Sequence, residues 1–125
     1  PEAVVVAVGG GGLLCGIVQG LHEVGWQDVP VFTAETEGAA SLAESIKAGK
    51  LITLDAIKTI ARSLGARRVA DQAWEWTKHH AIFPCIVSDK QALNACLRFL
   101  DQHRVLVEPA CGAALAVIYE HLIDA

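Results

Sequence analysis

The chain has 125 residues, of which 53% are hydrophobic and 19% are charged, and its formal net charge is −4. This length suits one domain with one core, and the high apolar content excludes intrinsic disorder. Because Lys and Arg form no basic run, nucleic acids and anionic membrane surfaces are not expected as partners. No apolar run is long enough to cross a bilayer, and no signal peptide is expected before the first predicted strand.

The first predicted unit is a strand, a glycine loop and a helix. Val4–Val8 is a continuous apolar run, typical of a strand that is covered on both faces. Gly9–Gly12 follow, and a helix is predicted from Leu13 to the stop at Gly25. Its apolar face comprises Leu14, Ile17, Val18, Leu21 and Val24. A second strand over Val29–Ala34 completes a βαβ pattern, which implies parallel strands.

The remainder of the chain continues this alternation of helices and strands. A loop is expected over 35–41 and a helix over 42–48, followed by turns and short helical pieces over 50–68, a helix over 67–79 and a strand over 82–89. The next helix is capped by Ser88 or Asp89, and one of its faces carries Leu93, Cys96, Leu97 and Leu100. A short strand from Val105 and an Ala-rich helix from about Ala113 complete the chain. The order predicts an α/β fold with an open parallel sheet and helices on both faces.

The four cysteines are interpreted as reduced core residues of a cytoplasmic protein. None belongs to a Cys-x-x-Cys pair, and all lie in apolar surroundings. They are Cys15, Cys85, Cys96 and Cys111.

The four consecutive glycines are the first candidate for a binding site, because ordering them costs more backbone entropy than ordering any other residues. Their spacing does not match the dinucleotide fingerprint, since Leu14 or Cys15 stands where the last glycine is required. It does not match the P-loop either, since Ile17 replaces the lysine. A strand, a glycine loop and a helix still present backbone N–H groups at the positive end of a helix. We therefore interpret Gly9–Gly12 as a site for a small phosphate, with a tight packing loop as the alternative.

Two carboxylates have open roles. Glu108 lies at the end of a predicted strand, before Pro109 and a turn of small residues. Its residue type allows two roles equally: it orients a cofactor or substrate group, or it caps the following helix. Glu35, taken by itself, is interpreted as an exposed loop carboxylate.

Several stretches together resemble the serine dehydratase/threonine deaminase family. They are VGGGGLLCGIVQGL, VPVFTAETEGAASLAESIKAGKL, IARSLGARRVADQA and VLVEPACGAALAVIYEHL. The resemblance covers nearly the whole chain and is least specific over 74–80. It implies a fold-type-II pyridoxal-phosphate enzyme of the tryptophan-synthase-β group, with residues 1–125 as part of its large, cofactor-binding domain. The first strand begins almost at once and the chain ends inside a helical pattern, so we expect a piece of a longer protein.

The resemblance also implies the site residues. The loop for the cofactor phosphate falls on Gly9, Gly10, Gly11, Gly12 and Leu13. A monovalent cation, usually potassium, would be held by the carbonyl oxygens of Gly9, Ala39, Leu64 and Ala66 and by the carboxylate of Glu35. Hard oxygen ligands of this kind suit an alkali cation.

No catalytic residue is expected within these 125 residues. The resemblance places the Schiff-base lysine in an upstream Ser-x-Lys motif and the residue that meets the pyridine nitrogen downstream. The lysines present are expected on the surface: Lys47, Lys50, Lys58, Lys78 and Lys90.

For the intact protein, the resemblance implies dehydration and deamination of L-serine, and of L-threonine, to pyruvate or 2-oxobutanoate and ammonia. It also implies a cytoplasmic homodimer that acts in amino-acid metabolism and gluconeogenesis. The alternative is a non-catalytic anion-binding or regulatory α/β module. A Ser-x-Lys lysine in the intact protein would favour the enzyme, and its absence would favour the module.

Overall fold

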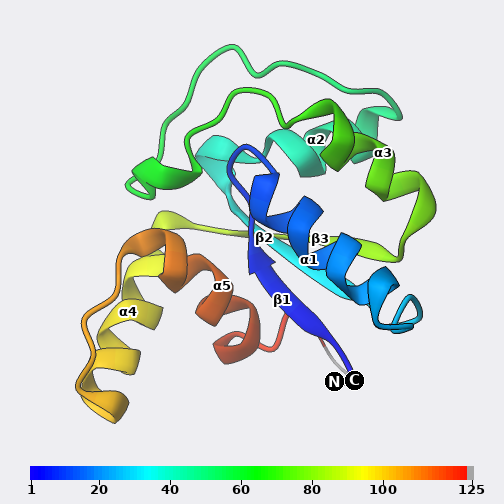
Figure 1. Ribbon diagram of the computed structural model, residues 1–125. Coiled ribbons are helices and arrows are strands. Elements are labelled where there is room, and N and C mark those ends of the chain that lie inside the picture. Colours follow the sequence, from blue (N-terminus) through cyan, green and yellow to red (C-terminus); the bar gives the residue numbers. More distant parts are fainter. Residues whose placement is uncertain (124–125) are drawn as a thin grey trace.

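A computed structural model describes residues 1–123 and contains one three-stranded parallel sheet (Figure 1). The strands are β1 (Val4–Ala7), β2 (Val31–Thr36) and β3 (Ile82–Val87), in the order β1-β2-β3. β2 is the central strand and pairs in parallel with both neighbours. The predicted parallel βαβ unit is therefore confirmed.

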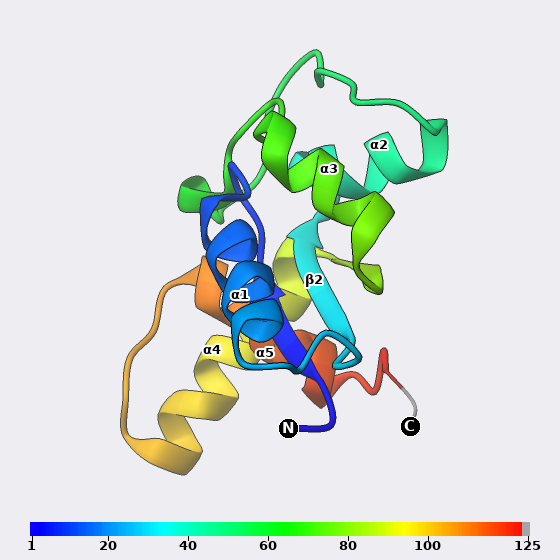
Figure 2. The same ribbon diagram turned by 45° about the vertical axis from the view of Figure 1, so that its right-hand side comes forward.

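Helices cover both faces of the sheet (Figures 1 and 2). The helices and 3₁₀ turns are α1 (Gly12–Glu23), η1 (Glu37–Ala39), α2 (Ser41–Ala48), η2 (Arg62–Leu64), α3 (Asp71–His79), α4 (Asp89–His103) and α5 (Pro109–Tyr119). On one face, β-strand residues pack with α1, α2 and α3, and on the other face they pack with α4 and α5. The predicted α/β fold, with an open parallel sheet covered on both sides, is confirmed. Over residues 1–123, every helix is too short or too polar to traverse a bilayer.

The alternation of side chains along each strand explains the continuous apolar run of the first strand. Val6 packs beside Leu14 and Val18 of α1, whereas Val5 packs on the opposite face with the α5 cluster. Because both faces are covered, both sets of side chains are apolar. Pro84 lies in β3, an edge strand, where a missing N–H group is tolerated.

The α4–α5 pair packs through small residues rather than through the predicted leucines. Ser88 caps α4 as predicted and forms a reciprocal capping box with Gln91. Of the residues predicted to share one face of this helix, Leu93 and Leu97 are exposed, whereas Cys96 is buried. The buried residues of α4 are Ala92, Ala95 and Cys96. Gly112 of α5 lies so close to α4 that an added Cβ would overlap the Ala92 carbonyl oxygen.

The C-terminal region differs from its predicted form. Within residues 1–123, no strand forms at 105–107, and α5 begins at Pro109 rather than at Ala113. The fixed φ of proline suits the first position of a helix, so the helix begins there. Smaller differences concern the bounds of three elements. The second strand runs over 31–36 instead of 29–34, α3 begins at Asp71 instead of Arg67, and the third strand ends at Val87 instead of Asp89.

The cysteines occupy different environments. Cys96 is buried, Cys15 and Cys85 are half-buried, and all four thiols are free. The assignment of Cys111 to the core was wrong, because this residue is exposed. Its apolar sequence neighbours pack inward from the other side of α5.

Candidate functional site

A cavity of about 330 Å³ lies beside the carboxyl end of β1. Three segments enclose it: the glycine loop between β1 and α1, the turn η2, and the start of α5 (Figure 1). Its lining residues are Ala7, Gly9, Gly10, Gly11, Gly12, Leu13, Ser63, Leu64, Glu108, Ala110 and Cys111. Ligands of parallel α/β proteins bind at this edge of the sheet. All five residues of the predicted phosphate loop are therefore brought together on one cavity wall.

The packing of Gly11 fixes the conformation of the glycine loop, whereas Gly10 and Gly12 have free space beside their Cα atoms. Gly11 has φ of 89°, in the left-handed region, and an added Cβ would lie 2.6 Å from the Cβ of Ala73. In contrast, no atom lies within 4 Å of the positions that a Cβ would take at Gly10 and Gly12. The backbone N–H of Ala70 donates to the Gly10 carbonyl at 2.8 Å and anchors the loop to the start of α3. A ligand can thus approach the backbone of Gly10 and Gly12 in a loop whose conformation is set by Gly11.

Two helices begin at this cavity. In α1 the first intrahelical bond runs from the Cys15 N–H to the Gly11 carbonyl, and in α5 from the Gly112 N–H to the Glu108 carbonyl. The N–H groups of the preceding residues in each first turn have no partner within their helix. No side chain caps either helix. Two positive helix ends and N–H groups without a partner in their own helix make the cavity suitable for a phosphate group.

Glu35 is a buried carboxylate, so its interpretation as an exposed loop residue was wrong. It lies at the carboxyl end of β2, and its side chain is 0% exposed. The backbone N–H groups of Leu42 and Ala43 donate to its two oxygens at 2.9 and 2.8 Å, which caps α2. Burial raises the pKa of the Glu35 carboxyl to about 7, although the two N–H bonds act in the opposite direction.

The residues of the predicted cation site lie at the same edge of the sheet. Gly9 and Leu64 are adjacent, because an added Cβ at Gly9 would lie 3.2 Å from the Leu64 Cα. Ala39 is in η1, directly after β2, and Ala66 follows η2, where its N–H donates to the Leu64 carbonyl at 2.9 Å. These positions belong to turns and strand ends, where carbonyl oxygens are not all used by a helix or a sheet.

The chemistry of these donors fits an alkali cation. Glu35 takes part in neither of the ion pairs found in residues 1–123, which are Arg68–Asp71 and Lys78–Glu75. A buried carboxylate without a cationic side chain is stabilised by a bound cation. The same part of the chain holds no cluster of three or more His, Cys, Asp or Glu side chains that could bind a metal. A cation beside Glu35 would therefore depend on carbonyl oxygens for its remaining ligands.

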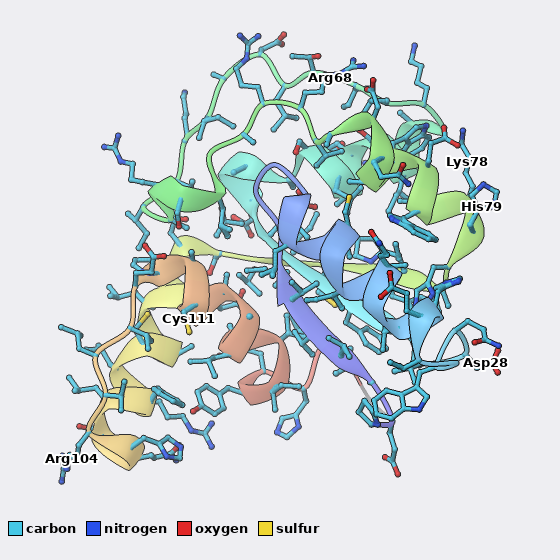
Figure 3. All side chains as sticks on the ribbon, in the orientation of Figure 1. Asp28, Arg68, Lys78, His79, Arg104 and Cys111 are labelled. Carbon is cyan, nitrogen blue, oxygen red and sulfur yellow. The ribbon has the colours of Figure 1, made fainter. Side chains whose placement is uncertain are left out.

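The lysines lie away from the cavity, as predicted. All five are exposed, and none lines the cavity. Figure 3 shows Lys78 at the outer end of α3, on the opposite side of the view from Cys111 at the start of α5.

Three polar side chains line the cavity beside the glycine loop. Glu108 does not cap α5; its Oε1 accepts a hydrogen bond from the Ser63 hydroxyl at 3.2 Å. Cys111 is the third polar residue of the lining. Sequence reasoning named Glu108 but missed the other two. Ser63 lies in the weakly patterned segment, and Cys111 is surrounded in sequence by alanine, glycine and proline, so neither carried a signal.

An uncapped glycine loop at the carboxyl edge of a parallel sheet, open to a phosphate, is the arrangement expected of a phosphate-bearing cofactor site. A family profile described as "Pyridoxal-phosphate dependent enzyme" matches residues 1–125. The chain belongs to this family, and its fold is that of the fold-type-II enzymes, of which it covers part of a domain.

Individual proteins and solved structures are similar to this chain over nearly its whole length. The chain is 57% identical over 124 residues to L-serine dehydratase/L-threonine deaminase of Bos taurus, covering 99% of this chain and 38% of that protein. It superposes on an L-serine ammonia-lyase from Rhizomucor miehei with a TM-score of 0.93 and 41% identity, covering 98% of this chain and 39% of that one. Maize serine racemase gives a TM-score of 0.85 and 30% identity, covering 92% and 36%. The chain thus spans less than two fifths of the length of these relatives.

Proposed function

We propose that the protein containing residues 1–125 is a pyridoxal-phosphate-dependent ammonia-lyase. It would convert L-serine, and L-threonine, to pyruvate or 2-oxobutanoate and ammonia, with these residues as part of its large, cofactor-binding domain. The observation that carries the proposal is the open glycine loop on a cavity where two helices begin. The identity of 57% to a serine dehydratase supports the substrate class. No observation favours a non-catalytic regulatory module.

The glycine loop would hold the cofactor phosphate. Backbone N–H groups of Gly9, Gly10, Gly11, Gly12 and Leu13 would bind its oxygens, with the positive end of α1 adding favourable charge. Ala7, Leu64 and Ala110 supply the apolar part of the wall, which would exclude water from one side of the bound ring. Pyridoxal phosphate, when bound, supplies the electron-withdrawing ring that makes the α-hydrogen of an amino acid acidic.

The covalent attachment and the proton transfers require an amine near the cavity. A lysine in water stays protonated near its ordinary pKa of about 10.4, so an exposed lysine is a poor nucleophile and a poor base. The five lysines present are all exposed, and none of them lines the cavity. We therefore assign the lysine to a part of the protein outside residues 1–125, and we expect these residues alone to be inactive.

A potassium ion would occupy the site formed by the Glu35 carboxylate and the carbonyl oxygens of Gly9, Ala39, Leu64 and Ala66. The ion would offset a buried charge that lacks a cationic partner side chain in residues 1–123. Gly9 and Leu64 both line the cofactor cavity. A cation bound to their carbonyl groups would fix the two peptide planes, so cation and cofactor binding would be coupled.

Assembly and cellular role stay predictions. A homodimer, a cytoplasmic location and a role in gluconeogenesis rest on the resemblance alone. The expectation that nucleic acids and membranes are not partners rests on the lack of a basic run in the sequence. Sedimentation of the full-length protein would check the dimer.

The activity is tested with the full-length protein loaded with pyridoxal phosphate. L-serine should yield pyruvate and ammonia in equal amounts, and L-threonine should yield 2-oxobutanoate. Chiral analysis of the remaining serine separates this reaction from racemisation. Accumulation of D-serine without pyruvate would contradict the proposal.

A further inference from the structure

Glu108 occupies a helix-capping position without capping the helix. It is the N-cap residue of α5, with φ of −78° and ψ of 161°. A carboxylate at this position ordinarily accepts hydrogen bonds from N–H groups of the first turn. Here it makes no such bond, and its Oε1 accepts from the Ser63 hydroxyl, 45 residues earlier in the chain. The carboxylate is thus tied to η2, on the cavity wall, rather than to its own helix.

The backbone of Glu108 is anchored in the interior. Its carbonyl oxygen accepts from the Gly112 N–H at 3.0 Å and from the Cys96 thiol at 3.4 Å. Gly112 also packs directly against Ala92 of α4. Because the buried α4–α5 contact sets this backbone, the placement of the carboxylate at the cavity is a property of the fold.

Among residues 1–123, Glu108 is the only carboxylate that lines the cavity, and no cationic side chain of this part of the chain lines it. The titratable groups on adjoining elements are Cys111 on α5, Cys96 on α4 and Arg62 on η2. None of them forms an ion pair with Glu108 in the described part of the chain. The cavity therefore presents phosphate-binding N–H groups on one wall and an unpaired anion on another.

An unpaired anion in a cofactor cavity favours a cationic group on the ligand. In pyridoxal phosphate the phosphate arm and the C4′ carbon are on neighbouring ring atoms, and the ring nitrogen is further away. The positive charge of a protonated imine is shared between its nitrogen and C4′, so part of this charge lies next to the phosphate arm that the glycine loop would hold. We propose that Glu108, positioned by Ser63, is the counter-charge for the protonated imine nitrogen at C4′ of the bound cofactor. This inference rests on the proposed function.

The test is a pH titration of the visible absorption band of the cofactor in the full-length protein. Glu108→Gln keeps the size of the side chain and an acceptor for Ser63, and it removes the charge. Loss of the charge should lower the pKa of the imine by about one unit or more, a tenfold loss of proton affinity. Ser63→Ala should give a smaller shift in the same direction. Glu120→Gln, an exposed carboxylate that follows α5 outside the cavity, is the matched control and should give none.

The outcomes separate the inference from the function. A wild-type imine titration in Glu108→Gln, with normal lyase activity in the wild type, would overturn the inference alone. A shifted titration in a protein that does not deaminate serine would support the inference and contradict the function. A shift that disappears with the 1-deaza cofactor analogue would assign the charge to the ring nitrogen and overturn the inference. Failure of the wild type to form an imine would overturn both.

Discussion

Replacing Gly12 by alanine adds one methyl group that extends into the space beside the glycine loop without contacting other parts of the protein. No atom lies within 4 Å of the position that this Cβ would take, so the protein itself has room for it. Gly12 is also outside the left-handed region, which among the loop glycines is occupied only by Gly11. We therefore expect folding to be unaffected or slightly stabilised, because alanine favours helices over glycine by about 1 kcal/mol.

The effect on the cofactor should be large. A phosphate oxygen that accepts a hydrogen bond from this part of the backbone cannot share the space with a methyl group. Hydrogen bonds to charged groups contribute about 1.5–3 kcal/mol. Loss of one such bond should raise the Kd for pyridoxal phosphate roughly 10- to 100-fold, since each 1.4 kcal/mol is about tenfold. Gly10→Ala should behave in the same way, because its Cβ also meets open space.

The assay is a fluorescence titration of the full-length apoprotein with pyridoxal phosphate, with urea unfolding as the measure of stability. Gly16→Ala is the matched control: it lies one turn further along α1, is exposed, has no atom within 4 Å of its Cβ position and does not line the cavity. Gly11 is unsuitable, because its left-handed φ and its contact with Ala73 would damage the fold. Wild-type affinity in both Gly10→Ala and Gly12→Ala, or an equal loss in Gly16→Ala, would refute the reasoning.

Three further predictions concern the cation, the buried carboxylate and the α4–α5 contact. Replacement of potassium by lithium should weaken retention of pyridoxal phosphate by the full-length protein, because the smaller ion fits a cage of carbonyl oxygens poorly; equal retention in both salts would contradict the cation site. Burial raises the pKa of Glu35 to about 7 in the folded state, so the folded state binds this proton more tightly than the unfolded state. Stability without potassium should therefore fall as the pH rises from about 4.5 through 7, by about 3 kcal/mol for this group. The free energy of unfolding in urea, measured at pH 5 and at pH 8, should show this fall. The fall should be smaller in potassium and absent in Glu35→Gln. A rise in stability between these pH values that depends on Glu35 would contradict the burial argument. Gly112→Ala should destabilise the protein by about 1–3 kcal/mol, because the added methyl group overlaps Ala92 and Cys96. Gly20→Ala is the control and should not destabilise the protein, because its Cβ position is surrounded by open space. Equal stability of the two variants would show that α4 and α5 can move apart without a loss of stability.

The sequence by itself determined the architecture and the position of the glycine loop. The continuous apolar run of Val4–Val8 and the helical period from Leu13 define a strand and a helix through local chain geometry. A strand, a glycine loop and a helix in this order place the loop at the carboxyl edge of a parallel sheet. The family resemblance then predicted that this loop binds the phosphate of pyridoxal phosphate.

Only the tertiary structure decided which polar residues face the site and which residues form the core. Glu35 is buried because α2 begins directly over the end of β2 and needs a cap, which Ala40 does not supply. Glu108 faces the cavity because Ser63, distant in sequence, lies beside it. Leu93 and Leu97 are exposed because α5 packs on the alanines of α4 instead. Side-chain burial and partner choice depend on elements that meet only after folding, and the period of a single segment carries no information about them.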